Sequence, residues 1–201
     1  MSIQSMRNAT KNKKWVMVVV VCALIVGLLI TYAATANQSG GISSNDLQAQ
    51  IEAYNNAIEA TKQDLTETPD DFSLLSNLGE QYYNLAVAYS QQASTAESEQ
   101  KLAEADIAMT NAQESLNQSA GYYIQALDHA PEALNDKGRA DILMKIGGSY
   151  LLAGDSSKGN DYLRQGLEKA PLDFDNNVLY AQYMLLQGRT AEAQATLEYY
   201  K

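Results

Sequence analysis

Residues 143–171 restrict the possible folds of this chain most strongly, because small residues, a turn and a closing proline stand in them at fixed distances. Two apolar segments flank a turn at Gly154, and Pro171 follows the second segment. Proline ends helices because it has no amide N–H and disfavours helical geometry in the residue before it. Gly147 is small enough to let a second helix come close, and Leu163 would then pack between the two helices. The stretch therefore predicts a pair of packed antiparallel helices.

A helix pair of this kind cannot bury its apolar surface alone, so further helices are expected on both sides of it. Apolar residues at helical spacing predict a leading helix between Leu47 and Leu65, before the turn at Pro69. Residues 174–201 repeat the pattern of the central pair, and their last helix would leave part of its apolar surface exposed. We therefore expect an all-α domain built from successive antiparallel helix pairs.

Residues 72–133 form a unit that is longer than its neighbours. The additional residues do not have the composition of a loop, because apolar side chains such as Leu102 and Met109 continue at helical spacing. We expect two elongated antiparallel helices with a turn within residues 91–100.

Local signals add detail to this elongated unit. Asp70 and Asp71 follow a proline and are expected to form a turn and cap the next helix. Ser94 and Glu97 fit a capping box that would begin the second elongated helix. An additional helix pair, with a break near residues 117–121, is the alternative. Residues 132–139 are expected to connect this unit to the central pair.

An uncharged apolar run covers residues 15–34, which as a helix is long enough to span the hydrocarbon core of a bilayer, about 30 Å. Residues 1–36 contain basic residues only before this run, and no acidic residue. By the positive-inside rule, we predict a transmembrane anchor with a cytoplasmic N-terminus and an extracytoplasmic domain. A cleaved signal peptide ending at the A-x-A sequence of residues 34–36 is the alternative, although the run is longer than a typical signal core.

The remaining organisation follows from composition and charge. Residues 37–45 are rich in Gly and Ser and predict a short flexible linker, which leaves residues 46–201 as the helical domain. The chain carries 14 Lys and Arg against 24 Asp and Glu. Because residues 1–36 contain basic but no acidic residues, the domain is more acidic than the whole chain. Such a domain repels nucleic acids and anionic lipid headgroups. Nucleic-acid binding is therefore excluded as a function of the domain.

These positions make the chain similar to tetratricopeptide (TPR) repeat proteins, in which two helices pair in about 34 residues. The resemblance covers most of residues 46–201, and each of the three prolines, Pro69, Pro131 and Pro171, stands where a repeat closes. It implies a TPR-like α-solenoid of antiparallel helix pairs that serves as an interaction module and would follow the predicted N-terminal transmembrane helix. With its anchor, the chain resembles single-pass envelope TPR proteins of bacteria, whose members assist secretion, cytochrome c maturation or the assembly of surface machinery.

TPR proteins bind extended peptides or helices in a groove lined by the first helix of each repeat. The resemblance assigns this role to residues from three units: Ser76, Glu80, Tyr83 and Asn84; Asp141, Met144, Lys145 and Gly148; Asp175, Val178 and Gln182. This set lacks the several Lys and Asn residues with which the family holds C-terminal carboxylates. The groove is therefore expected to be neutral to acidic, and to suit a basic or mixed peptide.

The sequence offers no arrangement of residues for catalysis. His129 is the only histidine, and its position before Pro131 suits a cation at a helix C-terminus. Cys22, the only cysteine, lies in the apolar run, so neither a nucleophilic triad nor a transition-metal site can be assembled. The acidic residues that begin at Asp173 resemble a calcium loop, but Val178 stands where such a loop needs glycine. We expect no enzyme, no cofactor and no metal site.

The leading hypothesis is a membrane-anchored extracytoplasmic scaffold that binds a protein or peptide partner in the cell envelope. A helical ectodomain that binds a small molecule is a second hypothesis, although a cytoplasmic tail of about fourteen residues offers no output domain. A third is a self-assembling structural protein, with residues 102–127 or the last helix as the interface of a homo-oligomer.

Overall fold

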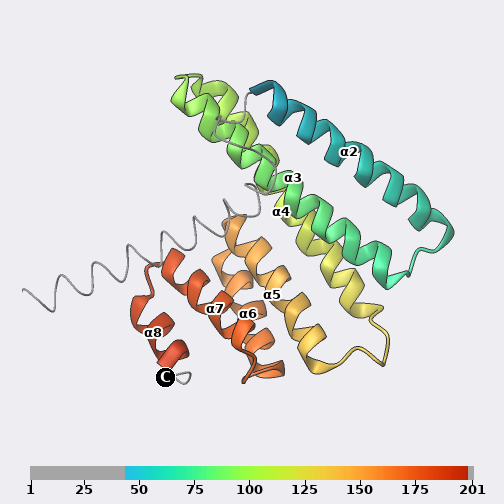
Figure 1. The fold of residues 1–201 in the computed structure, drawn as a ribbon, viewed down its shortest axis with the longest axis vertical. Helices are drawn as coiled ribbons and strands as arrows, with labels where there is room; N and C mark the ends of the chain where they lie inside the picture. The colour runs from blue at the N-terminus through green and yellow to red at the C-terminus, as the bar shows by residue number, and fades with distance from the viewer. Residues whose placement is uncertain (1–43, 199–201) are drawn as a thin grey trace, which may run out of the picture. The chain divides into compact units, whose positions relative to one another are not determined.

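The computed structural model describes residues 44–198, and all regular secondary structure in that range is helical. The predicted all-α class is confirmed for this part of the chain. Successive helices alternate in direction and pack mainly on their neighbours in sequence, in a solenoid-like series (Figure 1). The helices are α2 (Ser44–Glu67), α3 (Phe72–Ser98), α4 (Leu102–Asp128), α5 (Asp136–Leu152), α6 (Ser156–Lys169), α7 (Phe174–Leu186) and α8 (Thr190–Glu198).

The ends of the helices follow from proline and capping residues. Each proline lies two or three residues beyond the last residue of α2, α4 or α6, as predicted. At the other ends, a short polar side chain accepts a hydrogen bond from a backbone N–H three residues later, which satisfies a donor that the helix leaves free. These N-caps are Asp71 for α3, Asn135 for α5, Asp155 for α6 and Asp173 for α7.

Replacing Asp71 by alanine is expected to lower the free energy of unfolding by about 1 kcal/mol, because the 2.9 Å bond from the Leu74 N–H to Oδ1 is lost. Urea unfolding followed by circular dichroism measures the effect. Asp71→Asn keeps a capping oxygen and is the matched control, with little expected change. Equal losses in the two variants would show that the side-chain cap does not stabilise α3.

The central pair, α5 and α6, packs as its small residues predict. A Cβ atom on Gly147 would lie 2.7 Å from Leu163 Cγ and 2.9 Å from the carbonyl oxygen of Gly159. Leu163 is fully buried in a core cluster that also contains Met144 and Met184. The absence of a side chain at Gly147 therefore sets how closely the two helices approach.

The elongated hairpin is confirmed, with two corrections. α3 and α4 each contain 27 residues, and the turn between them occupies residues 99–101, at the end of the predicted range. The capping-box prediction is wrong: Ser94 and Glu97 lie inside the end of α3, and no side-chain cap precedes α4. The alternative break near residues 117–121 is also wrong, because α4 is continuous there.

The far half of this hairpin is held together by alanines rather than by large apolar side chains. Leu102 and Met109 belong to the predicted apolar series but are 67% and 44% exposed, whereas Ala105, Ala112 and Leu116 of the same series are buried. The buried positions on that part of α4 are alanines, and alanines also fill the facing part of α3. Small side chains allow the two helices to approach closely, so the buried stripe lies beside the one marked by the large residues.

The leading helix α2 packs along α3, as predicted (Figure 1). Ile51 and Ile58 from α2 are buried against Leu78 and Leu85 of α3 in a second core cluster. The connection predicted at residues 132–139 ends earlier in the structure, because α5 begins at Asp136. Asn135 is the N-cap of α5, and the helix therefore begins before the first residue of the apolar pattern.

The predicted transmembrane segment at residues 15–34 and most of the linker at residues 37–45 lie outside the described residues, as do residues 199–201. Among the helices from α2 to α8, none has both the length and the apolar composition that a membrane span requires.

Candidate functional site

The first helices of the successive pairs, α3, α5 and α7, are joined by polar and aromatic side chains. Four of these side chains, Glu80, Tyr83, Asp141 and Lys145, belong to the predicted groove, and the others were not predicted. We use the name first-helix face for this set, together with the Tyr123 side chain that α4 inserts into it. Its residues are Glu80, Tyr83, Tyr123, Asp141, Lys145, Asn176 and Tyr183.

Glu80 is the centre of the first part of this face. Its Oε2 accepts a hydrogen bond from the Tyr123 hydroxyl at 2.7 Å and from Lys145 Nζ at 2.7 Å. Lys145 Nζ also lies 5.2 Å from the centroid of the Tyr123 ring, within reach of a cation–π contact. One carboxylate therefore links α3, α4 and α5.

The environment of Glu80 keeps it ionised. Burial favours the neutral acid, but the hydrogen bonds from Lys145 and Tyr123 outweigh burial, so the pKa of Glu80 lies below its ordinary value of 4.5. Burial and the Glu80 carboxylate both raise the pKa of Tyr123, which keeps its hydroxyl protonated as a donor. The pair therefore forms a charge-assisted hydrogen bond at pH values above the folded-state pKa of Glu80.

Glu80→Gln is expected to lower the free energy of unfolding by about 0.5–1 kcal/mol at neutral pH, since the ion pair with Lys145 is half-exposed. Because the folded-state pKa of Glu80 lies below 4.5, its contribution is present above that pH and is lost as the pH falls through the folded-state pKa. Urea unfolding of both proteins at several pH values should show the difference shrinking as the pH falls from 4.5 through the folded-state pKa of Glu80. A difference that is independent of pH would contradict the assignment.

A second set of contacts joins α5 to α7. Asn176, which is buried, donates from Nδ2 to Asp141 Oδ1 at 3.0 Å. The Tyr183 hydroxyl occupies the space that a side chain on Gly148 would fill, so that glycine seats the ring against α5. Burial, and to a smaller extent the neighbouring Tyr83, raises the pKa of Tyr183. A tyrosine seated on a glycine occurs on both sides of the face, because the Tyr123 ring lies in the same way against Gly79.

The end of the face near the start of α5 and α7 carries excess negative charge. Lys137 Nζ is 2.8 Å from Asp173 Oδ2, 3.5 Å from Asp141 Oδ1 and 4.0 Å from Asp175 Oδ2. One ammonium group thus stands among three carboxylates, and the Asp175 side chain is largely exposed. A positively charged group that approached here would meet a favourable potential.

The predicted groove residues do not all lie where they were expected. Met144 is fully buried in the core, and its sulfur is 2.9 Å from where a Cβ on Gly166 would be, so it offers nothing to a partner. Ser76 is half-buried, and its Oγ has no hydrogen-bond partner within the described residues. The others remain accessible to different degrees: Asn84, Val178 and Gln182 are half-buried, and Asp175 is exposed.

Sequence reasoning missed Asn176 and Tyr183, which contact α5 in place of the expected stripe on α7. The expected and observed stripes on α7 differ by one residue, or about 100° of rotation. Gly148 could have indicated the contact with Tyr183. Gly147 alone accounts for the close approach of α6, so a second glycine beside it indicates that another bulky side chain packs against α5.

Between residues 44 and 198, no three His, Cys, Asp or Glu side chains are placed to hold a metal ion. His129 caps the C-terminal end of α4, and its Nε2 lies 3.4 Å from Asp70 Oδ1. No protein-family model matches the sequence, and no curated protein is significantly similar to it.

Proposed function

We propose that this chain is a membrane-anchored, TPR-like scaffold of the cell envelope, which binds a protein partner through its first-helix face. The observation that supports this best is the linkage of three successive first helices by Glu80, Lys145 and Asn176, with partly exposed tyrosine and carboxylate groups between them. Solenoids of helix pairs use such continuous surfaces to bind extended segments. The apolar run at residues 15–34 and its basic flank support the anchor and its orientation.

The partner segment we propose is extended and carries basic side chains. Glu80 is already neutralised by Lys145, which leaves the three carboxylates around Lys137 as the main unbalanced charge on the face. Tyr83 offers a half-buried aromatic surface for an apolar side chain. A peptide that places an Arg or Lys near Asp175 and an apolar residue near Tyr83 would match this surface.

The experiment is cross-linking of the tagged full chain in its native membrane, followed by purification and mass spectrometry. It compares the unaltered chain with a variant in which Glu80, Tyr83 and Asp175 are replaced by alanine. A matched control replaces Gln113, Asn117 and Gln165, which are exposed on second helices. Circular dichroism establishes that both variants remain folded.

We expect one partner at near-stoichiometric yield, lost in the first variant and retained in the control. The same partner retained in both variants would contradict the proposed surface. Recovery of this chain alone would favour the self-assembling structural protein instead.

A further inference from the structure

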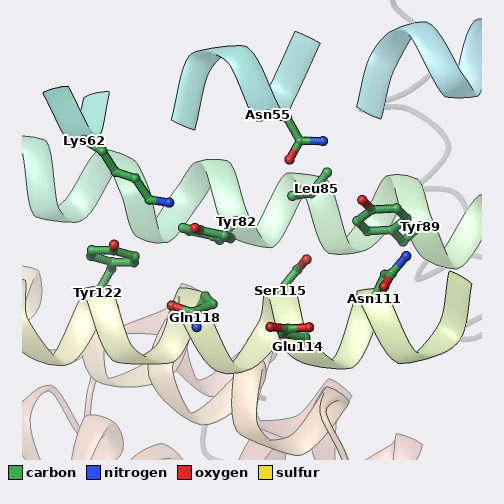
Figure 2. Close-up of a pocket in the computed structure, with 10 residues that line it drawn as sticks. All are labelled: Asn55, Lys62, Tyr82, Leu85, Tyr89, Asn111, Glu114, Ser115, Gln118 and Tyr122. Carbon is green, nitrogen blue, oxygen red and sulfur yellow. The ribbon is translucent and has the colours of Figure 1, made fainter. Parts of the chain in front are cut away.

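A cavity of about 300 Å³ opens between α2 and α4, across the surface of α3. Its volume is at the lower end of the range for ligand pockets, about 300–1,000 Å³. Figure 2 shows side chains from all three helices pointing into it, with Asn55 on α2, Tyr82 on α3, and Gln118 and Tyr122 on α4. The cavity exists because the stripe of α4 that faces α2 is polar, so no apolar side chains fill the space between the two helices.

This cavity is separate from the first-helix face. Tyr82, Leu85 and Tyr89 line it from one side of α3, at spacings of three and four residues. Glu80 and Tyr83 project from about the opposite side of the same helix. A ligand in the cavity would therefore not compete with a peptide on the first-helix face.

Aromatic rings form one wall of the cavity. The rings of Tyr82 and Tyr122 are stacked, with centroids 5.5 Å apart and an angle of 10° between their planes (Figure 2). Both tyrosines are half-buried, so part of this surface remains open to a ligand. Flat aromatic surfaces suit the C–H faces of a sugar ring, which are apolar while the edge of the ring carries hydroxyl groups.

The facing groups can hydrogen-bond to hydroxyls. Asn55, Asn111 and Gln118 bring carboxamides, each of which offers both a donor and an acceptor, as a hydroxyl does. Within the described residues, these three side chains and that of Glu114 make no hydrogen bond to the protein, and Asn55, Glu114 and Gln118 are exposed, so a ligand would take the place of solvent as their partner. The buried Ser115 adds a hydroxyl at the floor.

The charges of the cavity disfavour an anion. Lys62 and Glu114 are the two ionised residues that line it. Lys62 is engaged by Glu59, at 3.0 Å, and lies 5.6 Å from the Tyr82 ring centroid, so the Glu114 carboxylate is left without a cationic partner among the described residues. An anion would be repelled by that carboxylate, whereas the hydroxyl groups of a neutral polyhydroxyl ring can donate hydrogen bonds to it.

We propose that this cavity is a binding site for a saccharide, occupied by one or two sugar rings. The parts of the Tyr82 and Tyr122 rings that their mutual stacking and Lys62 leave uncovered contact the sugar, and the carboxamides of Asn55, Asn111 and Gln118 bind its hydroxyls. The proposal is independent of the protein partner, since it rests on a different side of α3.

Isothermal titration of the full chain tests this proposal, with any detergent chosen to lack a sugar headgroup. The probes are glucose, galactose, mannose, N-acetylglucosamine and their β- and α-linked disaccharides, each up to about 10 mM so that millimolar binding registers. Gln118→Ala removes one hydrogen-bonding group and should weaken binding about fivefold. Tyr122→Ala removes half of the aromatic wall and should weaken it about tenfold.

Gln113→Ala is the matched control, because it removes the same side chain from the same helix at an exposed position outside the cavity. Its affinity should equal that of the unaltered chain. The proposal is overturned if no probe binds, or if Gln118→Ala and Gln113→Ala have the same affinity. Saturable binding of inorganic phosphate or of a lysine-rich peptide at this site, with none of the sugars, would also overturn it.

Discussion

Replacing Gly147 by alanine is expected to lower the free energy of unfolding by about 2–3 kcal/mol. The added Cβ would lie 2.7 Å from Leu163 Cγ, 2.8 Å from the backbone nitrogen of Leu163 and 2.9 Å from the Gly159 carbonyl oxygen. Two of these atoms are backbone, so no side-chain rotation relieves the overlap and α6 must move as a whole. Urea unfolding of the variant measures the loss, and the same curve shows whether the slope of the transition changes.

Gly121→Ala is the matched control for this prediction. It also places alanine inside a helix, but a Cβ there would meet no atom within 4 Å. Alanine is the better helix former by about 1 kcal/mol, so this variant should be as stable as the unaltered chain or more stable. If both variants lost stability equally, close approach of α5 and α6 would not be what requires glycine at position 147.

Leu78→Ala is expected to lower the free energy of unfolding by about 2–5 kcal/mol. Leu78 is fully buried between α2 and α3, where it packs with Ile51, Ile58 and Leu85. Truncation leaves a cavity lined by rigid neighbours on two helices, and the loss depends on how far those helices can collapse into it. Denaturant unfolding measures the loss, and hydrogen exchange in α2 reports whether this helix opens with the rest of the domain.

Leu102→Ala provides the comparison, since that leucine is 67% exposed at the tip of the α3–α4 hairpin. Its truncation should change the free energy of unfolding by no more than about 0.5 kcal/mol. A small effect at Leu78, or independent exchange of α2 in the unaltered chain, would mean that the leading helix is not part of the cooperative unit.

The order and ends of the helices could be predicted because strong local signals mark them. Each proline stands beyond a helix, and Asp71 caps the next helix, for reasons that hold in almost any fold. The approach of α5 and α6 was also predictable, because Gly147 and Leu163 leave one compact way to pack.

What could not be predicted was the rotation of individual helices about their axes. On α4, the predicted apolar series includes Ala105 and Ala112, which are buried, but also Leu102, which is exposed because the alanine-lined side of the helix packs on α3. On α7, Tyr183 and Asn176 turn towards α5, one residue away from the stripe we expected. The rotation of a helix about its axis depends on the shape of the helix that it packs against. That shape is determined by the sequence of the neighbouring helix and not by the sequence of the rotated helix itself.

The cavity next to α2 was missed for a related reason. Asn111, Ser115, Gln118 and Tyr122 follow one another at helical spacing, but a polar stripe on a helix ordinarily indicates a surface facing solvent. Only the position of α2, packed along α3 at some distance from α4, converts that stripe into the wall of a pocket (Figure 2).

The central proposal is that a partner protein binds the first-helix face, and site-specific photo-cross-linking in intact cells that produce the chain tests it most directly. A photoreactive residue is placed in turn at Tyr83 on α3 and Asp175 on α7, and at the exposed positions Gln113 on α4 and Gln165 on α6. The account predicts one adduct of a partner protein from positions 83 and 175, and none from positions 113 and 165. Equal adducts from all four positions, or adducts only with a second copy of this chain, would contradict it.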